Sequence, residues 1–248
     1  MDLGLKNKIA LVTGASSGIG AAVARLLAHE GADVVVAFGN DADGARRTAA
    51  AIEIAGRRAW LSRFDAADAA ATASAIQAAG VETGGFDVVV VCAGRNIVTP
   101  LAEVTPEEWN AIIGVNLNGA FYTLRAVIPF LRDNAAIVTV ASVAGSTGAP
   151  HHAHYAAAKA GVVNLTKSAA RALAPRVRVN CVAPGIALTP MGRETVASLA
   201  PDYARTRLAL QRYAEPEEIA RCIVFLASPA SSFVTGATLD VNGGREMR

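Results

Sequence analysis

Apolar residues along the chain follow two alternating patterns. Short runs rich in Val, Ile and Ala predict buried strands, and apolar positions at 3.6-residue spacing predict helices. The expected strands cover residues 9–13, 33–38, 59–64, 86–92, 136–141, 177–182 and 238–241. The expected helices cover about 43–55, 67–79, 106–131, 153–174 and 216–226, after a first helix that begins near Ile19 and stops at Gly31. The alternation predicts an α/β fold with a doubly wound, parallel, seven-stranded sheet of Rossmann type.

The chain shows no linker, repeat or low-complexity block that would divide it, so residues 1–248 are expected to form a single domain. The stretch 189–213 is less regular and follows the C-terminal end of an expected strand. Ligands bind at that edge of doubly wound sheets. We therefore expect 189–213 to be a flap that covers the substrate.

Composition narrows the classes of function. Hydrophobic residues make up 52% of the chain and charged residues 18%, which predicts an ordered core. The net charge of +2 gives no strong field toward nucleic acid or an anionic membrane, and neither is expected as a partner. The longest apolar run of the strand-like segments, 88–93, is too short to span a bilayer, and the N-terminus has no apolar signal core. The scattered Cys92, Cys181 and Cys222 fit buried free thiols in a reducing compartment, the cytoplasm.

A glycine-rich loop joins the first strand to the first helix. It reads Thr13-Gly14-Ala15-Ser16-Ser17-Gly18-Ile19-Gly20. Such glycines allow a tight turn, a close backbone approach to a pyrophosphate and close helix–strand packing, while the helix N-terminus faces the anion. The pattern alone also fits a turn without a ligand. Its position before an amphipathic helix favours a dinucleotide site.

Tyr155 and Lys159 lie four residues apart on an expected helix and therefore share one face. A tyrosine beside an ammonium can give a proton to a substrate or take one from it. A free tyrosine has a pKa of about 10, and a nearby ammonium together with an oxidised nicotinamide would lower it. Taken alone, Tyr155 and Lys159 also fit a solvent-facing helix surface. Ser142 alone fits a serine in a turn, and Asn116 alone fits a buried structural residue.

Taken together, the glycine spacing, Asn116, Ser142, Tyr155-x-x-x-Lys159 and Pro184-Gly185 resemble the short-chain dehydrogenase/reductase family, in its single-domain branch of about 250 residues. The resemblance implies an NAD(P)-dependent enzyme acting on a small carbonyl or alcohol. Tyr155 is then the general acid/base, Ser142 holds the substrate oxygen, and Asn116 positions Lys159 through a water. The implied cofactor contacts are Gly14, Ser16, Ser17, Gly18, Ile19, Gly20, Phe38, Asn40, Asp65, Ala66, Ala93, Gly94, Tyr155, Lys159, Pro184, Gly185, Ala187 and Thr189.

Two departures from the family pattern matter. The fourth strand ends in Val91-Cys92-Ala93-Gly94 where the family usually has Asn-Asn-Ala-Gly, so the hydrogen bonds there should differ. The second strand ends in Phe38 where NAD-preferring members carry an acid, and Asp41 reads as a helix N-cap. We therefore expect a preference for NADP(H) over NAD(H), with Asn40 at the 2′-phosphate. Asp65 is expected to contact the adenine or to cap the helix before Ala66.

The sequence does not identify the substrate. The chain resembles 3-oxoacyl-(acyl-carrier-protein) reductases along its length, but the shared motifs also occur in sugar, polyol and other secondary-alcohol dehydrogenases. Of two arginines typical of carrier-protein docking, Arg171 is present and Ala136 stands in place of the other. Three other classes of protein are considered. A non-catalytic nucleotide-binding redox sensor would be expected to lack Tyr155 or Lys159, and a methyltransferase has no need for this pair. An epimerase would recycle its nicotinamide without net turnover.

Two further expectations concern the surface and the assembly. His151, His152 and His154 lack carboxylate or cysteine partners at ligand spacing, so they are expected on a loop face and not at a metal. The helices at 106–131 and 153–174 carry small residues and resemble those that pair across a two-fold axis in the family. A homotetramer is therefore expected.

Overall fold

The computed structural model describes residues 3–247 and confirms the seven-stranded parallel sheet. The strand order is β3-β2-β1-β4-β5-β6-β7, and every neighbouring pair is parallel. The strands are β1 (Ile9–Thr13), β2 (Asp33–Phe38), β3 (Ala59–Arg63), β4 (Phe86–Val91), β5 (Leu131–Val140), β6 (Arg178–Pro184) and β7 (Thr238–Val241). The order reverses between β1 and β4, so the carboxyl ends of these two strands form the crevice where such sheets bind ligands.

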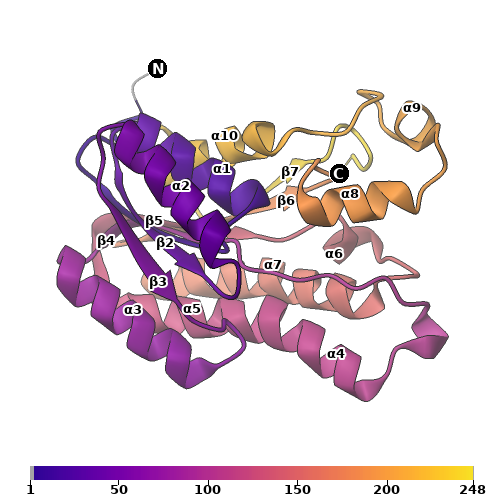
Figure 1. Ribbon diagram of the computed structural model, residues 1–248, viewed down its shortest axis with the longest axis horizontal. Coiled ribbons are helices and arrows are strands. Elements are labelled where there is room, and N and C mark those ends of the chain that lie inside the picture. Colours follow the sequence, from indigo (N-terminus) through magenta and orange to yellow (C-terminus); the bar gives the residue numbers. More distant parts are fainter. Residues whose placement is uncertain (1–2, 248) are drawn as a thin grey trace.

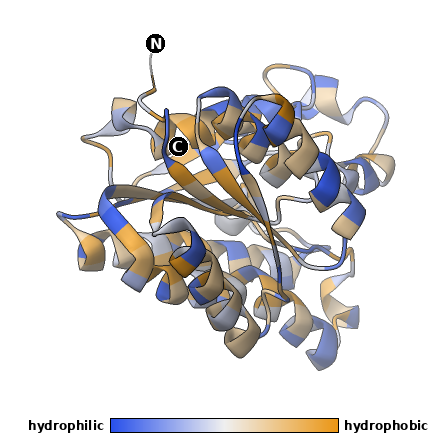
Figure 2. Cartoon of the chain, turned by 60° about the vertical axis from the view of Figure 1, so that its left-hand side comes forward, coloured by the Kyte–Doolittle hydropathy of each residue, from blue (hydrophilic) through white to orange (hydrophobic). Residues whose placement is uncertain are grey.

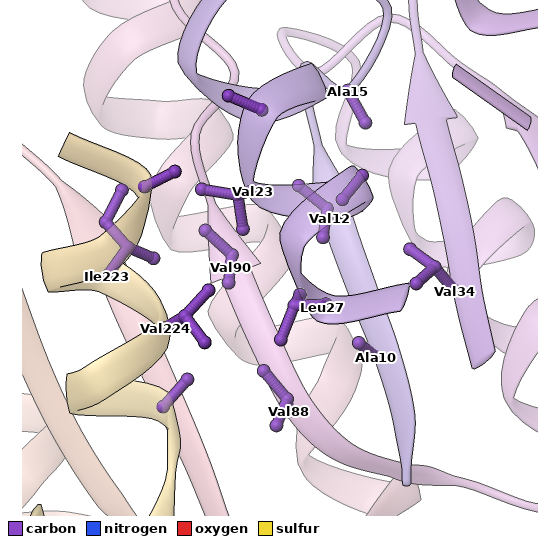
Figure 3. Packing of buried hydrophobic residues seen from close by; sticks show 14 of the residues in the cluster. Ala10, Val12, Ala15, Val23, Leu27, Val34, Val88, Val90, Ile223 and Val224 are labelled. Carbon is purple, nitrogen blue, oxygen red and sulfur yellow. The ribbon is translucent and has the colours of Figure 1, made fainter. Parts of the chain in front are cut away.

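Helices cover both faces of the sheet (Figure 1). One layer holds α1 (Gly18–His29), α2 (Ala42–Ile54) and α10 (Pro216–Ala227). The other holds α3 (Ala69–Thr83), α4 (Pro106–Ile113), α5 (Gly119–Val127) and α7 (Ala153–Leu173). The sheet between them is largely hydrophobic along its strands, as Figure 2 shows. Figure 3 shows the first interface, in which Val23 and Leu27 of α1 and Ile223 of α10 pack against Val12 and Val90.

The expected single helix over 106–131 is interrupted. Residues Gly114–Asn118 form a π-helical turn between α4 and α5. The cause is Asn116, whose side-chain amide donates to the carbonyl oxygens of Ile112 and Arg95 and so enters the helical hydrogen-bond ladder. The turn places this amide below the end of β4, and it could not be read from the apolar pattern.

Strand β5 begins five residues earlier than the expected 136–141 because polar residues extend it. Its register against β4 shifts between Phe86 and Val88. Arg132 lies in this irregular part and donates to Asp87 at 2.8 Å. An ion pair across the strand ends thus holds a segment that lacks the apolar alternation of a strand.

The stretch after β6 is more regular than expected. It contains α8 (Pro190–Ala197) and α9 (Tyr203–Arg207), and a short α6 (Ala144–Thr147), also unexpected, follows β5. A parallel bridge between Ala187 and Ala214 joins the two ends of the α8–α9 segment. In Figure 1 the segment overhangs the carboxyl ends of the strands.

Candidate active site

One cleft of about 1020 Å³ runs along the carboxyl edge of the sheet. Every residue that the sequence indicates as a cofactor contact lines it, from the glycine loop to Thr189. Of the four candidate catalytic residues, Ser142, Tyr155 and Lys159 line it as well, and Asn116 lies behind its wall. Such a volume is at the upper end of the range for ligand sites and leaves room for a dinucleotide together with a substrate.

The glycine loop has the shape that a dinucleotide cradle requires. Gly14 and Gly18 adopt φ values of 67° and 54°, which favour glycine. A Cβ on Gly14 would lie 2.9 Å from the Cα of Ala93, so the loop lies directly against the end of β4. Ser17 at the N-cap of α1 makes no side-chain cap hydrogen bond. The positive end of α1 therefore faces the cleft uncapped, which fits a pyrophosphate.

The end of β2 presents no acid to the cleft. Phe38 and Asn40 line it, whereas Asp41 does not. The Asp41 carboxylate instead accepts from the backbone N of Gly44 at 2.8 Å and caps α2, as expected. The end of β2 therefore presents no negative charge at the position where an acid would repel a 2′-phosphate.

Two charged residues lie at this end of the sheet, of which only Asp65 lines the cleft. Asp65 lines it and accepts from the backbone N of Ala67, but α3 begins at Ala69 and its N-cap is Asp68, so the alternative role of Asp65 as a helix cap is wrong. Arg63, at the end of β3, donates from Nε to the carbonyl oxygen of Gly39 at 3.2 Å. Sequence reasoning missed this arginine because β3 and β2 pair only in the folded sheet.

The catalytic candidates meet where β5 and α7 adjoin. The hydroxyls of Ser142 and Tyr155 are hydrogen-bonded to each other. The Nζ of Lys159 lies 5.5 Å from the centre of the Tyr155 ring and donates to the carbonyl oxygen of Val140 at 2.9 Å. The four-residue spacing thus places phenol and ammonium on one face of α7, beside the serine that follows β5.

Asn116 supports this group from below. It is almost fully buried, and its amide binds the backbone of Arg95 and Ile112. A Cβ on Gly94 would lie 2.8 Å from the Asn116 Oδ1 and 3.4 Å from the Lys159 Nζ, so only glycine leaves this space open. Asn116 and Lys159 thus flank the same small space without a direct hydrogen bond in the described part of the chain.

Burial, and not the ammonium, controls the proton affinity of Tyr155 in this state. Burial raises the pKa of Tyr155 to about 12, and the hydrogen bond from Ser142 opposes the rise only in part. Burial also lowers the pKa of Lys159, which is committed to Val140. The expected lowering by Lys159 is therefore absent without cofactor, and a further positive charge is needed, which oxidised nicotinamide supplies when bound. A phenol that holds its proton is suited to act as an acid.

Cys92 takes the place of the usual asparagine at the end of β4. The backbone N–H groups of Cys92 and Ala93 both donate to the Thr13 hydroxyl, at 3.0 and 3.1 Å, which ties β4 to β1. Burial raises the pKa of the Cys92 thiol to about 11, so the thiol stays neutral beside Lys159. The three cysteines are free, as expected, but only Cys181 is fully buried.

The three histidines occupy different surroundings. The expectation of a loop face is wrong for His154, which is completely buried. Its Nδ1 accepts from the backbone N of Tyr155, so its Nε2 carries the proton and donates to Glu108 at 2.8 Å. This pair links α4 to the first turn of α7. His151 and His152 line the cleft, and no cluster of three metal-binding side chains occurs within residues 3–247.

Comparison with known proteins places this geometry in a family. Residues 14–246 match the family model described as Enoyl-(Acyl carrier protein) reductase. The chain belongs to the short-chain dehydrogenase/reductase family. It is 44% identical to cis-4-hydroxycyclohexanecarboxylate dehydrogenase of Sinomonas cyclohexanicum over 96% of both chains. It is 38% identical to a 3-oxoacyl-(acyl-carrier-protein) reductase of Thermotoga maritima over 97% of this chain and 98% of the relative.

A solved structure of this short-chain dehydrogenase/reductase family supports the same fold. A short-chain dehydrogenase from Burkholderia cenocepacia J2315 in complex with NADP superposes with a TM-score of 0.92 at 34% identity, over 97% of this chain and 98% of that one. The protein is therefore an NAD(P)-dependent oxidoreductase that moves hydride between a nicotinamide and a carbonyl or secondary alcohol.

Proposed function

We propose that the protein interconverts a small ketone and its secondary alcohol in this cleft, with Tyr155 as the general acid/base. The observation that carries the proposal is the hydrogen-bonded Ser142–Tyr155 pair beside Lys159. Nicotinamide, when bound, gives or accepts the hydride. In reduction, the Ser142 hydroxyl orients the carbonyl oxygen and Tyr155 transfers its phenolic proton to that oxygen as the C–H bond forms. Lys159 then stabilises the phenolate until a proton from solvent restores the phenol.

The cofactor preferred by this cleft is NADP(H). The absence of an acid at Phe38 and the capping role of Asp41 support it. The NADP complex of the relative from Burkholderia cenocepacia agrees with this preference. Asn40 is the neutral candidate for contact with the 2′-phosphate.

Phe38→Asp is expected to reverse the preference. The new carboxylate repels the 2′-phosphate and accepts hydrogen bonds from the ribose hydroxyls of NAD. The ratio of Kd values for NADP and NAD, measured by calorimetry, should change at least tenfold in favour of NAD. Tighter binding of NAD by the unsubstituted protein would contradict the preference.

The assembly proposed is a homotetramer in the cytoplasm, with 189–213 as the flap over the substrate. Support for association comes from the α4–α5 layer, Pro106–Phe130, which is the one helical stretch of the described chain long and apolar enough to cross a bilayer. It packs instead on α3 and α7. It nevertheless leaves Trp109, Phe121 and Ile128 about 40% exposed. An apolar helix face of this kind fits contact with a second copy.

A small free substrate is favoured over a carrier-bound acyl chain. The relative at 44% identity is by its name a dehydrogenase of a cyclic hydroxy acid, whereas the acyl reductase is 38% identical. Arg171 is exposed on α7 as carrier-protein docking requires, but Ala136 is buried in β5 and offers no charge.

The test is NADPH oxidation, followed at 340 nm, with an acetoacetyl thioester compared with cyclic ketones, open-chain ketones, sugars and polyol-derived ketoses. We expect kcat/KM for the best cyclic or open-chain ketone to exceed that for the thioester by at least about tenfold. If the thioester is the best substrate, the result favours an acyl-reductase function over reduction of a small free ketone. Turnover of none of them would contradict the proposed reaction.

A further inference from the structure

The part of the cleft beyond the catalytic hydroxyls is lined by positive and titratable side chains. Arg95, His151, His152 and Arg245 face it from three different parts of the chain. Among the described lining residues the only carboxylate is Asp65, which lies at the opposite, adenosine end. The substrate region therefore has a positive electrostatic bias that the small net charge of the chain does not reveal.

Arg245 is held in place by its backbone, and its guanidinium has no acidic partner. Its N–H donates to the side chain of Asn242, whose amide also donates to the carbonyl oxygen of Glu246. The guanidinium lies 6.0 Å above the centre of the Tyr203 ring, on α9. It forms no ion pair with any residue between 3 and 247. A half-buried guanidinium without an acidic partner is suited to bind a carboxylate through two parallel hydrogen bonds.

His152 adds a second group with a free ring nitrogen. Its Nδ1 faces two acceptors, the Asn96 Oδ1 at 3.0 Å and the carbonyl oxygen of Ile97 at 3.3 Å, so Nδ1 is the donor and Nε2 is left for a ligand. Burial lowers the pKa of His152, the bond to Ile97 opposes this, and the nearby Arg245 is among the groups that lower the pKa further. Arg245 carries a permanent positive charge, and an anion at this point would offset it.

The geometry points to a carboxylate-binding subsite, formed by Arg245 with His152, that selects ketones or secondary alcohols carrying a carboxylate away from the reacting carbon. This inference rests on the proposed function of the cleft. Arg245 supplies the permanent charge and the paired donors, and the Tyr203 ring lies beside it, with its centre 6.0 Å from the guanidinium. The Nε2 of His152 contributes a further hydrogen bond.

The position of the subsite favours a carboxylate of a short substrate over a phosphate of a carrier arm. His152 is the N-cap of α7, three residues before Tyr155. Since a helix rises about 1.5 Å per residue, the backbones of His152 and Tyr155 lie within about one helical turn of each other, and both side chains line the cleft. The phosphate of a pantetheine arm is many bonds removed from its thioester carbonyl and cannot lie so close to it.

The test compares 4-oxocyclohexanecarboxylate and 4-oxopentanoate with their methyl esters, using NADPH and four forms of the enzyme. For the unsubstituted enzyme we expect kcat/KM to be about ten- to a hundredfold higher for each acid that fits than for its ester, with the difference in KM. Arg245→Gln should remove this advantage and leave the ester within about twofold. Arg245→Lys should retain part of it. Arg221→Gln, an exposed arginine of α10 that does not line the cleft, is the matched control and should change neither value.

A binding measurement separates failure of the subsite from failure of the reaction. Cyclohexanecarboxylate and cyclohexanecarboxamide are titrated into the NADP⁺-loaded enzyme by calorimetry. Tighter binding of the carboxylate that is lost in Arg245→Gln supports the subsite even if no ketone is reduced, in which case the proposed reaction alone fails. Equal affinity for acid and amide, or an equal loss of both in Arg245→Gln, overturns the subsite even if ketones are reduced.

Discussion

Tyr155→Phe is expected to lower kcat at least about 100-fold, the usual scale for loss of a general acid, while the fold and the affinity for cofactor are retained. The substitution removes one oxygen and leaves the ring in place over Lys159. Ser142 then keeps its bond from the backbone N of Ala144 but loses its partner hydroxyl. Because no other described hydroxyl is bonded to Ser142, no group is placed to deliver the proton.

The measurement is the steady-state rate of NADPH oxidation with the best ketone of the panel, beside Kd for NADPH and the thermal midpoint. Tyr122→Phe is the matched control, since Tyr122 lies on α5 outside the cleft and contacts Phe121. It should leave kcat unchanged. A Tyr155→Phe enzyme with near-normal kcat would refute the role of the phenol.

Lys159→Met is expected to lower kcat/KM by at least about 100-fold and to weaken cofactor binding. Lys159 is 4% exposed, lines the cofactor cleft and carries the only ammonium among the described lining residues. Without it the phenolate of Tyr155 loses its stabilising charge. Burial lowers the pKa of Lys159, which shows that folding disfavours its charge. The apolar substitution removes this cost and also loses the hydrogen bond to Val140. We expect the cofactor-free variant to be at least as stable as the unsubstituted protein.

This opposition between activity and stability is the diagnostic feature of Lys159→Met. Steady-state kinetics measures kcat/KM, calorimetry with NADPH measures cofactor affinity, and urea unfolding measures stability. Lys167→Met, an exposed lysine two turns along the same helix, is the control and should change none of them. Retention of both kcat/KM and cofactor affinity in Lys159→Met would contradict the account.

The strands of the sheet could be predicted from the sequence because each depends mainly on the residues within its own segment. Three expected strands, at 9–13, 33–38 and 238–241, have the observed bounds, and each is followed directly by a glycine or a polar residue. The π-helical turn at Asn116 and the early start of β5 could not be predicted. Both depend on bonds between segments, from Asn116 to Arg95 and from Arg132 to Asp87, that form only after the chain has folded.

The candidate site also has a part that could be predicted from the sequence and a part that could not. The glycine loop and the Tyr155–Lys159 spacing are short motifs with a mechanical meaning, and the fold brings them together at one edge of the sheet. The charged groups of the substrate region carry no such motif. Arg245 follows β7 and lines the same cleft as His152 because β7 returns the chain to this edge. No spacing in the sequence indicates this proximity, or the burial of His154 against Glu108.

Transfer of a labelled hydride tests the central claim most directly. NADPH carrying deuterium at both C4 positions is incubated with the best ketone of the panel, and the alcohol is analysed by mass spectrometry and NMR. The account predicts one deuterium per alcohol, on the carbinol carbon, at a rate that falls at least about 100-fold in Tyr155→Phe. Alcohol formed without deuterium at that carbon, or labelled at an equal rate by Tyr155→Phe, would contradict direct hydride transfer in a cleft where Tyr155 supplies the proton.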